Sequence, residues 1–344
     1  MLYLDRNESQ YGPSPKCFDA LKNAGIEELS QYTRDYGRGV KSRVSERLAE
    51  WIGVNEKNIL LSYGSEGLLK YAVHKFLPKG GTLMVPDKSW WYYGAIAEEV
   101  EGKTVEYLIP EGDTSFYYDI ENMIDVYNTH KPEVIFIASP NNPTGNAMSH
   151  EDLKRVCSEF KNSIIIVDEA YWGFSGLDNS NAKELVNTFD NVLLFRTFSK
   201  YFGLAGICMG YGICSDKFEA FANYVTRYLG YSPIIENVTL AALDDLEYYE
   251  DINRKFQEDI QLYKETLAPY SFIKVFDTAA NFLMIRLHEE MFKPLQDYLL
   301  SHNISVKFFT DKVFNNHIRL SFGTQEQNKF VLDAIVEYAN KVGK

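Results

Sequence analysis

Cysteine and histidine are scarce in this chain, and long hydrophobic runs are missing. The 344 residues include four cysteines, none of which has the CxxC spacing of zinc and redox sites. The six histidines are scattered without ligand spacing, so no metal site is expected. No apolar stretch approaches the roughly 20 residues that a membrane helix needs. The composition therefore argues against a metal centre and a membrane span.

Basic residues are in the minority. Lysine and arginine total 35 against 48 aspartate and glutamate, which gives a formal net charge of −13. This charge repels polyanions, so we expect neither nucleic acid nor an anionic membrane as a partner. Residues 1–6 do not resemble a signal peptide, and the cysteine pattern fits a reducing compartment. A cytoplasmic location is the simplest expectation.

Apolar residues are abundant and are arranged in short periodic segments. At 45% hydrophobic composition, it can bury one large core and a smaller one. Between residues 119 and 168, helix-like patterns alternate with strand-like ones, which predicts an α/β fold with a mainly parallel sheet flanked by helices. After residue 272, short strands mix with two amphipathic helices. We expect a large domain at 31–235 and a small α+β domain from 1–30 and 236–344, joined by a long helix at about 234–267.

The stretch at 193–211, LLFRTFSKYFGLAGICMGY, carries the first chemical signal. A strand-like run precedes Thr197, Ser199 and Lys200, and small residues follow, so the lysine stands where a strand opens into a loop. Reactive groups of α/β folds lie at such places. A lysine near apolar and aromatic side chains loses its proton more readily and can attack a carbonyl carbon.

Three further stretches supply complementary groups. A buried strand pattern at 164–167 ends in Asp168, which can hold a pyridine nitrogen protonated. Another strand pattern, at 134–138, leads to a Pro-rich and Gly-rich turn that leaves the Asn142 amide free to donate. A third leads to Gly64 and Ser65 at the start of a helix, where backbone N–H groups bind phosphate. Together the four stretches supply what a lysine-bound pyridoxal phosphate needs.

Seven motifs resemble those of fold type I pyridoxal-phosphate enzymes in the class I/II aminotransferase family. Within that family, the sequence is most similar to the histidinol-phosphate aminotransferase group. The motifs occur in family order over nearly the whole chain: NESQYGPSP at 7–15, YGSEGLL at 63–69, SPNNPTG at 139–145, VDEAYWGF at 167–174, RTFSKYFGLAG at 196–206, ANF at 280–282 and IRLSFGT at 318–324.

The resemblance implies a role for each matching residue. Lys200 would bond to the cofactor as a Schiff base and shuttle a proton. Asp168 would pair with the pyridine nitrogen, while Tyr171 and Asn142 would hydrogen-bond the ring oxygen. The other implied cofactor contacts are Gly64, Ser65, Glu66, Thr197 and Ser199 at the phosphate, Trp90 on the ring, and Tyr36 reaching the phosphate of a second subunit in a homodimer. Tyr32 is the alternative to Tyr36, and Trp91 or Tyr92 are alternatives to Trp90.

Substrate binding is implied for Tyr11, Asn281, Lys307 and Arg319. An arginine in an apolar strand is suited to hold an anionic group in a two-bond fork. Two positions depart from the family pattern. Cys208 stands where most relatives have an arginine at the cofactor phosphate, for which Arg227 is a candidate substitute. Lys307 stands where the group has an arginine that helps to bind the substrate phosphate.

The expected activity is transfer of an amino group between a small phosphorylated amine or amino acid and a 2-oxo acid. A lyase that decarboxylates a phosphorylated amino acid, such as serine or threonine phosphate, is the alternative on the same scaffold. The two reactions differ in which substrate bond stands perpendicular to the cofactor ring, and pocket shape decides this. A third, less favoured hypothesis is a non-catalytic regulator with this fold. Such a regulator usually carries an appended DNA-binding domain, and none is expected from this sequence.

Overall fold

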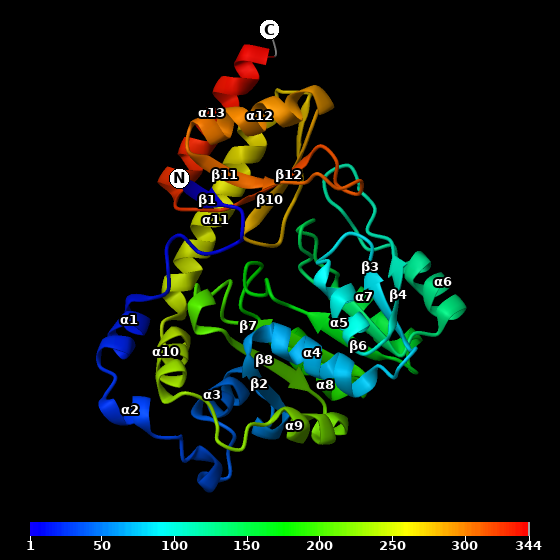
Figure 1. Ribbon diagram of the computed structural model, residues 1–344, viewed down its shortest axis with the longest axis vertical. Helices are drawn as coiled ribbons and strands as arrows, with labels where there is room; N and C mark the ends of the chain where they lie inside the picture. Colours follow the sequence, from blue (N-terminus) through cyan, green and yellow to red (C-terminus); the bar gives the residue numbers. More distant parts are fainter. Residues whose placement is uncertain (343–344) are drawn as a thin grey trace.

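The computed structural model describes residues 1–342, except for the side chain of Tyr36. Two β-sheets lie one above the other, each with its own helices (Figure 1). The larger sheet has seven strands and the smaller has five. The expected α/β fold, with a large mainly parallel sheet and a smaller α+β part, is confirmed.

The seven-stranded sheet forms the centre of the larger half. Its order is β2 (Ile59–Tyr63), β8 (Met209–Cys214), β7 (Val192–Thr197), β6 (Ile164–Asp168), β5 (Val134–Ala138), β3 (Thr82–Pro86) and β4 (Lys103–Tyr107). The strands from β7 to β4 are parallel, whereas β8 runs antiparallel to both β2 and β7. We did not predict β8, because its glycines resemble a loop.

Alternation of side chains along each strand divides the core into two layers. In β5, Ile135 and Ile137 join the hydrophobic cluster on one face, while Val134 and Phe136 join the cluster on the other. A strand buried on both faces needs an unbroken apolar run, which is why β5, β6 and β7 were visible in the sequence. Helices cover both faces: α3 (Arg43–Ile52), α4 (Gly64–Phe76), α5 (Tyr92–Glu99), α6 (Ile120–His130), α7 (His150–Glu159), α8 (Ser180–Thr188) and α9 (Glu219–Val225), with short 3-10 turns η1 (Asp35–Arg38), η2 (Glu56–Asn58), η3 (Ala205–Ile207) and η4 (Asp216–Phe218).

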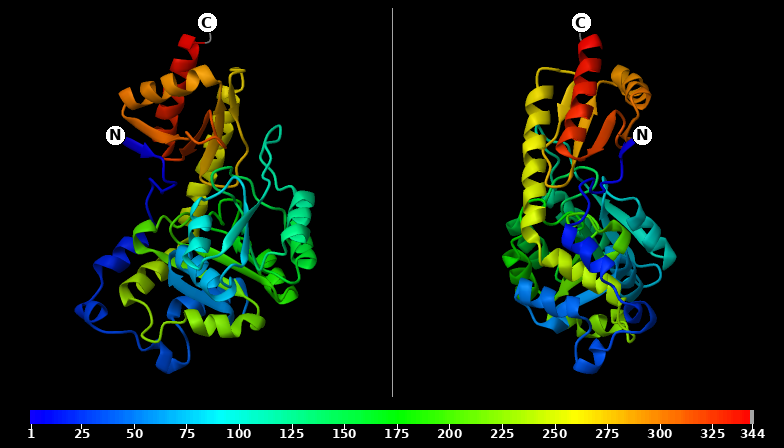
Figure 2. Two further views of the ribbon diagram at one scale, coloured as in Figure 1. Left: turned by 45° about the vertical axis from the view of Figure 1, so that its right-hand side comes forward. Right: turned by 90° about the vertical axis from the view of Figure 1, so that its left-hand side faces the viewer.

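The smaller half is built around the five-stranded sheet. Its order is β1 (Leu2–Leu4), β11 (Ile304–Phe308), β12 (His317–Ser321), β10 (Phe282–Leu287) and β9 (Ile273–Val275). The N-terminal strand β1 pairs in parallel with β11, so residues from the start of the chain complete a sheet that is otherwise formed by residues after 272. The helices of this half are α12 (Glu289–Ser301), α13 (Gln325–Val342) and the upper part of α11 (Leu246–Leu267), which runs along the sheet (Figure 2).

The long linking helix is broken, contrary to the prediction. It consists of α10 (Pro233–Leu243) and α11, which begins at Leu246. At the break Asp245 has non-helical backbone angles, with φ of −142° and ψ of 47°. Lys16 binds this segment, since its Nζ atom donates to the Asp244 carbonyl oxygen at 2.9 Å and forms an ion pair with Asp245 at 2.9 Å. Apolar periodicity continues across the break, so it could not reveal it.

The first 30 residues divide between the two halves. β1 lies in the smaller sheet, whereas α1 (Pro15–Lys22) packs along α10 and α2 (Ile26–Ser30) lies beside it in the larger half (Figures 1 and 2). The arm between them, residues 5–14, therefore passes across the junction of the halves. The domain boundaries proposed from the sequence remain a prediction.

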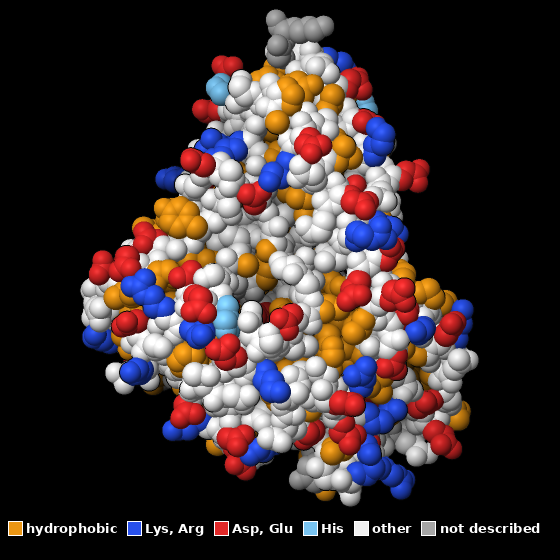
Figure 3. Space-filling view, turned by 180° about the vertical axis from the view of Figure 1, so that it is seen from behind, with side chains coloured by type: hydrophobic (Ala, Val, Ile, Leu, Met, Phe, Trp, Pro, Cys, Tyr) orange, Lys and Arg blue, Asp and Glu red, His pale blue; other side chains and the backbone are white. Residues whose placement is uncertain are grey.

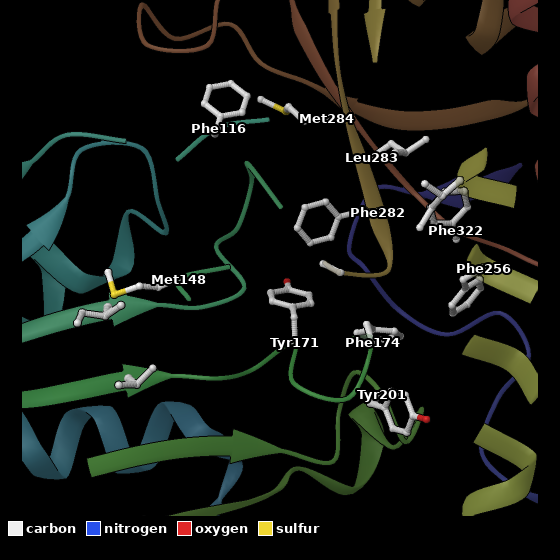
Figure 4. Close-up of a cluster of buried hydrophobic side chains, with 14 of the residues drawn as sticks. Phe116, Met148, Tyr171, Phe174, Tyr201, Phe256, Phe282, Leu283, Met284 and Phe322 are labelled. Carbon is white, nitrogen blue, oxygen red and sulfur yellow. The ribbon is translucent and has the colours of Figure 1, made fainter. Parts of the chain in front are cut away.

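Aromatic side chains from both halves meet at this junction. Figure 4 shows the ring of Tyr171, in the loop after β6, directed at Phe282 at the start of β10. Their ring centroids lie 5.1 Å apart in an edge-on arrangement. Such pairs contribute about 0.5–1.5 kcal/mol beyond area burial. The junction is therefore a packed extension of the core.

A loop of the larger half also reaches the smaller sheet. Glu111 forms ion pairs with Lys274 at 2.9 Å and with Arg286 at 2.5 Å.

Acidic and basic side chains are interspersed over the molecular face in Figure 3. Within residues 1–342, no helix combines the length and the apolar character needed to cross a bilayer.

Candidate active site

A cavity of about 780 Å³ opens at the carboxyl ends of the parallel strands, beneath the smaller sheet. Residues from β6, β7, the start of α4, the loop after β5, the N-terminal arm, β11 and β12 line it. It gathers most of the side chains that the sequence singled out: Gly64, Ser65, Glu66, Trp90, Asn142, Asp168, Tyr171, Thr197, Ser199, Lys200, Lys307 and Arg319.

Two predicted site residues do not appear in that lining, and the side chain of a third is not described. The Tyr11 hydroxyl accepts from the Gln325 backbone N–H at 3.0 Å, and the ring packs against Phe256. Asn281 is buried behind the cavity, where its Nδ2 atom donates to the Asn7 carbonyl oxygen at 3.2 Å. Direct substrate contact by Tyr11 and Asn281 is therefore not supported by this geometry. Tyr36 falls in η1, and its side chain lies outside the described part of the chain.

Asp168 is held deep in the cavity at the end of β6. The Tyr93 hydroxyl donates to its Oδ2 atom at 2.7 Å, and the Ala170 backbone N–H donates to Oδ1 at 3.1 Å. Burial raises the pKa of the Asp168 carboxyl to about 6, although both hydrogen bonds act to lower the pKa. A buried carboxylate without a cationic partner favours a cationic N–H group of a bound molecule.

Lys200 lies on the turn after β7, as expected. Its Nζ atom donates to the Arg6 carbonyl oxygen at 3.1 Å. Burial, together with the positive charge of Arg319, lowers the pKa of the Lys200 ammonium to about 8. At neutral pH, roughly a tenth of such a lysine is the free amine, compared with less than about a thousandth of an ordinary lysine. The site therefore favours a nucleophilic amine.

Tyr171 is oriented by the N-terminal arm. Its hydroxyl oxygen accepts from the Asn7 Nδ2 atom at 2.8 Å. Burial raises the pKa of the Tyr171 phenol, so the hydroxyl keeps its proton. Because the oxygen already accepts a bond from Asn7, its proton is available to an acceptor in the cavity.

The first turn of α4 provides an anion-binding position. Gly64, Ser65 and Glu66 line the cavity at the helix N-terminus, where backbone N–H groups lack partners within the helix. A second pair of hydroxyls lies close by, since Thr197 Oγ1 and Ser199 Oγ are 3.0 Å apart. Hydroxyls and N–H groups together suit a phosphate group.

Close approach of α4 to β8 depends on Gly210. A Cβ atom at that position would lie 2.4 Å from both the Gly64 carbonyl carbon and the Ser65 nitrogen. Both atoms belong to the backbone, so no side-chain rotation could relieve the clash. Any larger residue at position 210 would displace the first turn of α4.

Arg319 and Lys307 form the cationic side of the cavity. They are Cα partners in the antiparallel pair of β11 and β12. The Arg319 guanidinium donates to the Asn142 Oδ1 atom and to the Asp5 carbonyl oxygen, the second at 2.6 Å. Its Nε–H group is buried and has no hydrogen-bond partner among the described residues. Asn142 therefore holds Arg319, a contact that sequence reasoning did not anticipate.

Two tryptophans stand at the rim. Trp90 and Trp91 both line the cavity, whereas Tyr92 does not. The Trp90 ring packs at 5.7 Å against the edge of Tyr93, the residue that holds Asp168, while Trp91 is 77% exposed. Of the predicted stacking residues, Trp90 is the one that packs against Tyr93 and therefore lies next to Asp168.

Arg227, the candidate substitute for an arginine at position 208, does not line the main cavity. Cys208 is at the cavity wall with φ of 52°, and its thiol donates to the Ala205 carbonyl oxygen at 3.2 Å. Arg227 lies in a neighbouring hollow, where its guanidinium stacks 5.0 Å over the Tyr63 ring. Tyr63 lines both hollows, so it separates Arg227 from the main cavity.

Sequence reasoning missed four residues that build the site. Tyr93 and Gly210 gave no signal, because a tyrosine in an aromatic run and a glycine in an apparent loop are ordinary. Asn7 stood in a recognised motif without an assigned role. Arg6 precedes that motif and lines the cavity. Long-range contacts, invisible in a single sequence, give each of them its place.

Comparisons with known proteins agree with this geometry. The family description "Aminotransferase class I and II" matches residues 1–335. Histidinol-phosphate aminotransferase from Ruminiclostridium cellulolyticum is 32% identical, and the match covers 96% of this chain and 91% of that protein.

Solved structures show the same fold. Histidinol-phosphate aminotransferase from Sinorhizobium meliloti, in complex with pyridoxal 5'-phosphate, matches with a TM-score of 0.86 and 21% identity over 99% of this chain and 91% of that one. L-threonine-O-3-phosphate decarboxylase from Porphyromonas gingivalis matches with a TM-score of 0.78 and 16% identity over 99% and 100% of the two chains. The chain belongs to the aminotransferase class I and II family.

Proposed function

We propose that this pyridoxal-phosphate-dependent aminotransferase transfers the amino group of a small phosphorylated amine or amino acid to a 2-oxo acid. One observation carries the proposal: a single cavity holds the depressed-pKa Lys200, the buried Asp168 and the cationic pair Lys307 and Arg319. The first two suit a pyridoxal cofactor, and the cations suit an anionic substrate. The match to histidinol-phosphate aminotransferases supports the same substrate class.

The residues fit pyridoxal 5'-phosphate. Asp168 would take the pyridine N–H, because the buried carboxylate has hydrogen-bond donors but no cation among the described residues. Tyr171 would donate to the ring oxygen. Trp90 would cover the ring, and the phosphate would lie at the first turn of α4 beside Thr197 and Ser199. When bound, the cofactor supplies an electron sink for a carbanion next to the amine.

Lys200 supplies the proton transfer. It stands on a rigid turn after a buried strand and is partly unprotonated near neutrality. A neutral amine in this position accepts a proton from the substrate carbon and returns it elsewhere, as general acid–base catalysis requires. Arg319 can hold an anionic group of a substrate, because its Nε–H, without a partner among the described residues, is a donor that a ligand would satisfy.

The competing reaction is decarboxylation of a phosphorylated amino acid. The structural match to a threonine-phosphate decarboxylase shows a shared fold, and both reactions need Lys200, Asp168 and an anion site. Wild-type holoenzyme should be incubated with phosphorylated amines and amino acids, with 2-oxoglutarate as acceptor, while glutamate and carbon dioxide are measured. Glutamate without carbon dioxide is the expected result. Stoichiometric carbon dioxide without glutamate would assign the protein to the lyases.

A homodimer is the proposed assembly. Around α2 and the loop before α10, the apolar side chains of Ile26, Leu29, Tyr32 and Leu229 are between 47% and 80% exposed. Exposed apolar groups gathered in this way are typical of interfaces. They adjoin a hollow that shares Tyr63 with the main cavity, so a second subunit here would border the site. A cytoplasmic location remains a prediction from the sequence.

A further inference from the structure

The N-terminal arm forms part of the cavity wall. The Asp5 carbonyl oxygen accepts from Arg319 at 2.6 Å, and the Arg6 carbonyl oxygen accepts from the Lys200 Nζ atom at 3.1 Å. Asn7 donates to the Tyr171 hydroxyl at 2.8 Å. Three consecutive arm residues thus contact three different side chains of the site. Arg6 itself is one of the residues that line the cavity.

Asn7 anchors the arm and so fixes the backbone position of the preceding residue, Arg6. Asn7 is 1% exposed and takes φ of 56°. Its backbone N–H donates to Ser321 Oγ at 2.9 Å, and its carbonyl oxygen accepts from Asn281 at 3.2 Å. Ser321 also donates to the Asn7 Oδ1 atom at 2.8 Å. A buried residue held at three points keeps the preceding arginine over the cavity.

Arg6 carries a charge that no described acidic group neutralises. Its side chain is exposed at the mouth and forms no ion pair or side-chain hydrogen bond within residues 1–342. Lys307, also exposed, forms no side-chain hydrogen bond or ion pair with the described residues, and its Nζ atom lies 5.7 Å from the centroid of the Phe309 ring. The negative charge of Asp5 acts on Arg319 instead. Two uncompensated cations at one opening of an acidic protein attract an anion.

We propose that Arg6 is a specificity-determining residue that binds, together with Lys307, the phosphate of a phosphomonoester amine. This inference rests on the proposed function and assigns the residue that recognises the phosphate of the substrate. A phosphate carries a charge of about −1.5 to −2 and three acceptor oxygens, so one fork-shaped guanidinium and one ammonium match it. A neutral alcohol in the same place would leave both cations unpaired. Arg319, already bonded to Asn142 and Asp5, lies further inside.

The test compares a phosphorylated amine with its dephosphorylated alcohol. Holoenzymes of the wild type, Arg6→Gln and Arg6→Lys are assayed with both compounds and 2-oxoglutarate. Arg6→Gln should lower kcat/KM for the phosphorylated amine by at least about tenfold, mainly through KM, because a charge-assisted contact is lost. The alcohol should be affected less than about twofold, and Arg6→Lys should restore part of the loss. Lys161→Gln removes an exposed charge beyond the cavity and should change neither rate.

A second measurement keeps the inference testable without turnover. Borohydride-reduced holoenzyme, in which the cofactor is fixed in place, is titrated with inorganic phosphate. Wild type should bind phosphate at least about tenfold more tightly than Arg6→Gln. Equal affinities, or equal loss for both amines in the assay, would overturn the role of Arg6. A wild type that uses both amines equally would instead refute the proposed substrate class, whatever Arg6→Gln does.

Discussion

Burial controls the reactive side chains of this site at the scale of single residues. Asp168 and Lys200 lie in one cavity, and burial moves the pKa of each toward neutrality, upward for the acid and downward for the amine. Loss of solvation disfavours the charged form of both groups. The charge of each group can therefore change near neutral pH when a charged or hydrogen-bonding ligand binds beside it.

The depressed pKa of Lys200 predicts the pH dependence of cofactor capture. Only the neutral amine attacks an aldehyde, so the rate at which apoprotein takes up pyridoxal phosphate should rise with pH through about 8. Borohydride trapping at successive pH values, followed by peptide mass analysis, measures the rate. Lys200→Ala should keep its circular dichroism spectrum and give no adduct. A major adduct on another lysine would contradict the assignment.

The raised pKa of Asp168 predicts a stability cost in the apoprotein. The pKa of Asp168 is near 3.8 in the unfolded chain and about 6 in the folded protein, so the folded protein binds the proton more tightly. The stabilisation that this proton provides is complete below about pH 4 and is lost as pH rises through about 6. The loss is on the order of 3 kcal/mol. Asp168→Asn removes this titration.

Urea unfolding of both apoproteins between pH 4 and 7 tests this expectation. Asp168→Asn should gain stability relative to wild type as pH rises, by up to about 3 kcal/mol. In holoprotein the sign should reverse, because the variant loses the partner of the pyridine N–H group. A constant difference across the pH range would mean that Asp168 does not titrate there.

At the scale of elements, the site depends on where strands and helices end. Lys200 follows β7 and Asp168 closes β6, and parallel pairing brings these ends to one edge. The loop that follows Asp168 is held by Arg196, which pairs with Glu169 at 2.6 Å and stacks on Trp172 at 3.7 Å. Arg196 is 2% exposed, so its removal would leave the partly buried carboxylate of Glu169 without this ion pair.

Gly210→Ala should weaken cofactor binding. The added Cβ would meet backbone atoms of Gly64 and Ser65 at 2.4 Å and push the first turn of α4 away from the phosphate position. We expect affinity for pyridoxal phosphate to fall by about tenfold or more, the equivalent of one lost charge-assisted contact. Equilibrium dialysis measures it. Gly206→Ala is the matched control, because a Cβ there meets nothing within 4 Å. Equal affinities for both variants would refute the steric explanation.

For the whole molecule, the two halves are joined at several independent places. The N-terminal strand sits in the smaller sheet, α11 spans both halves, and Glu111 reaches Lys274 and Arg286. These connections enclose the cavity from the side of the smaller sheet. The exposed apolar group around α2 is in the larger half, away from them (Figure 1).

Leu29→Glu should weaken the proposed dimer. Leu29 is 75% exposed in a single chain, so a charge there should leave the fold unchanged but oppose burial against a second subunit. Sedimentation analysis over a range of concentrations should show wild type at twice the protomer mass and the variant shifted toward monomer. Leu262→Glu, a comparable change on α11, should stay dimeric. A monomeric wild type would remove the proposal.

The sequence alone determined the elements with continuous apolar runs and the residues whose chemistry is explicit. The strands β5, β6 and β7 were visible because both their faces are buried, and Lys200 and Asp168 because each follows such a strand. Ordered motifs added the family. All of these signals are local in the chain or repeated among relatives.

Only the tertiary structure decided which groups meet. Arg319 is joined to Asn142 across 177 positions, and Tyr93 reaches Asp168 across 75. At the break between α10 and α11, Asp244 is bound by Lys16, more than 200 residues earlier. The sequence also could not show that Tyr11 faces α13 rather than the cavity. Such contacts arise from how two sheets and an arm pack, and packing depends on all elements at once.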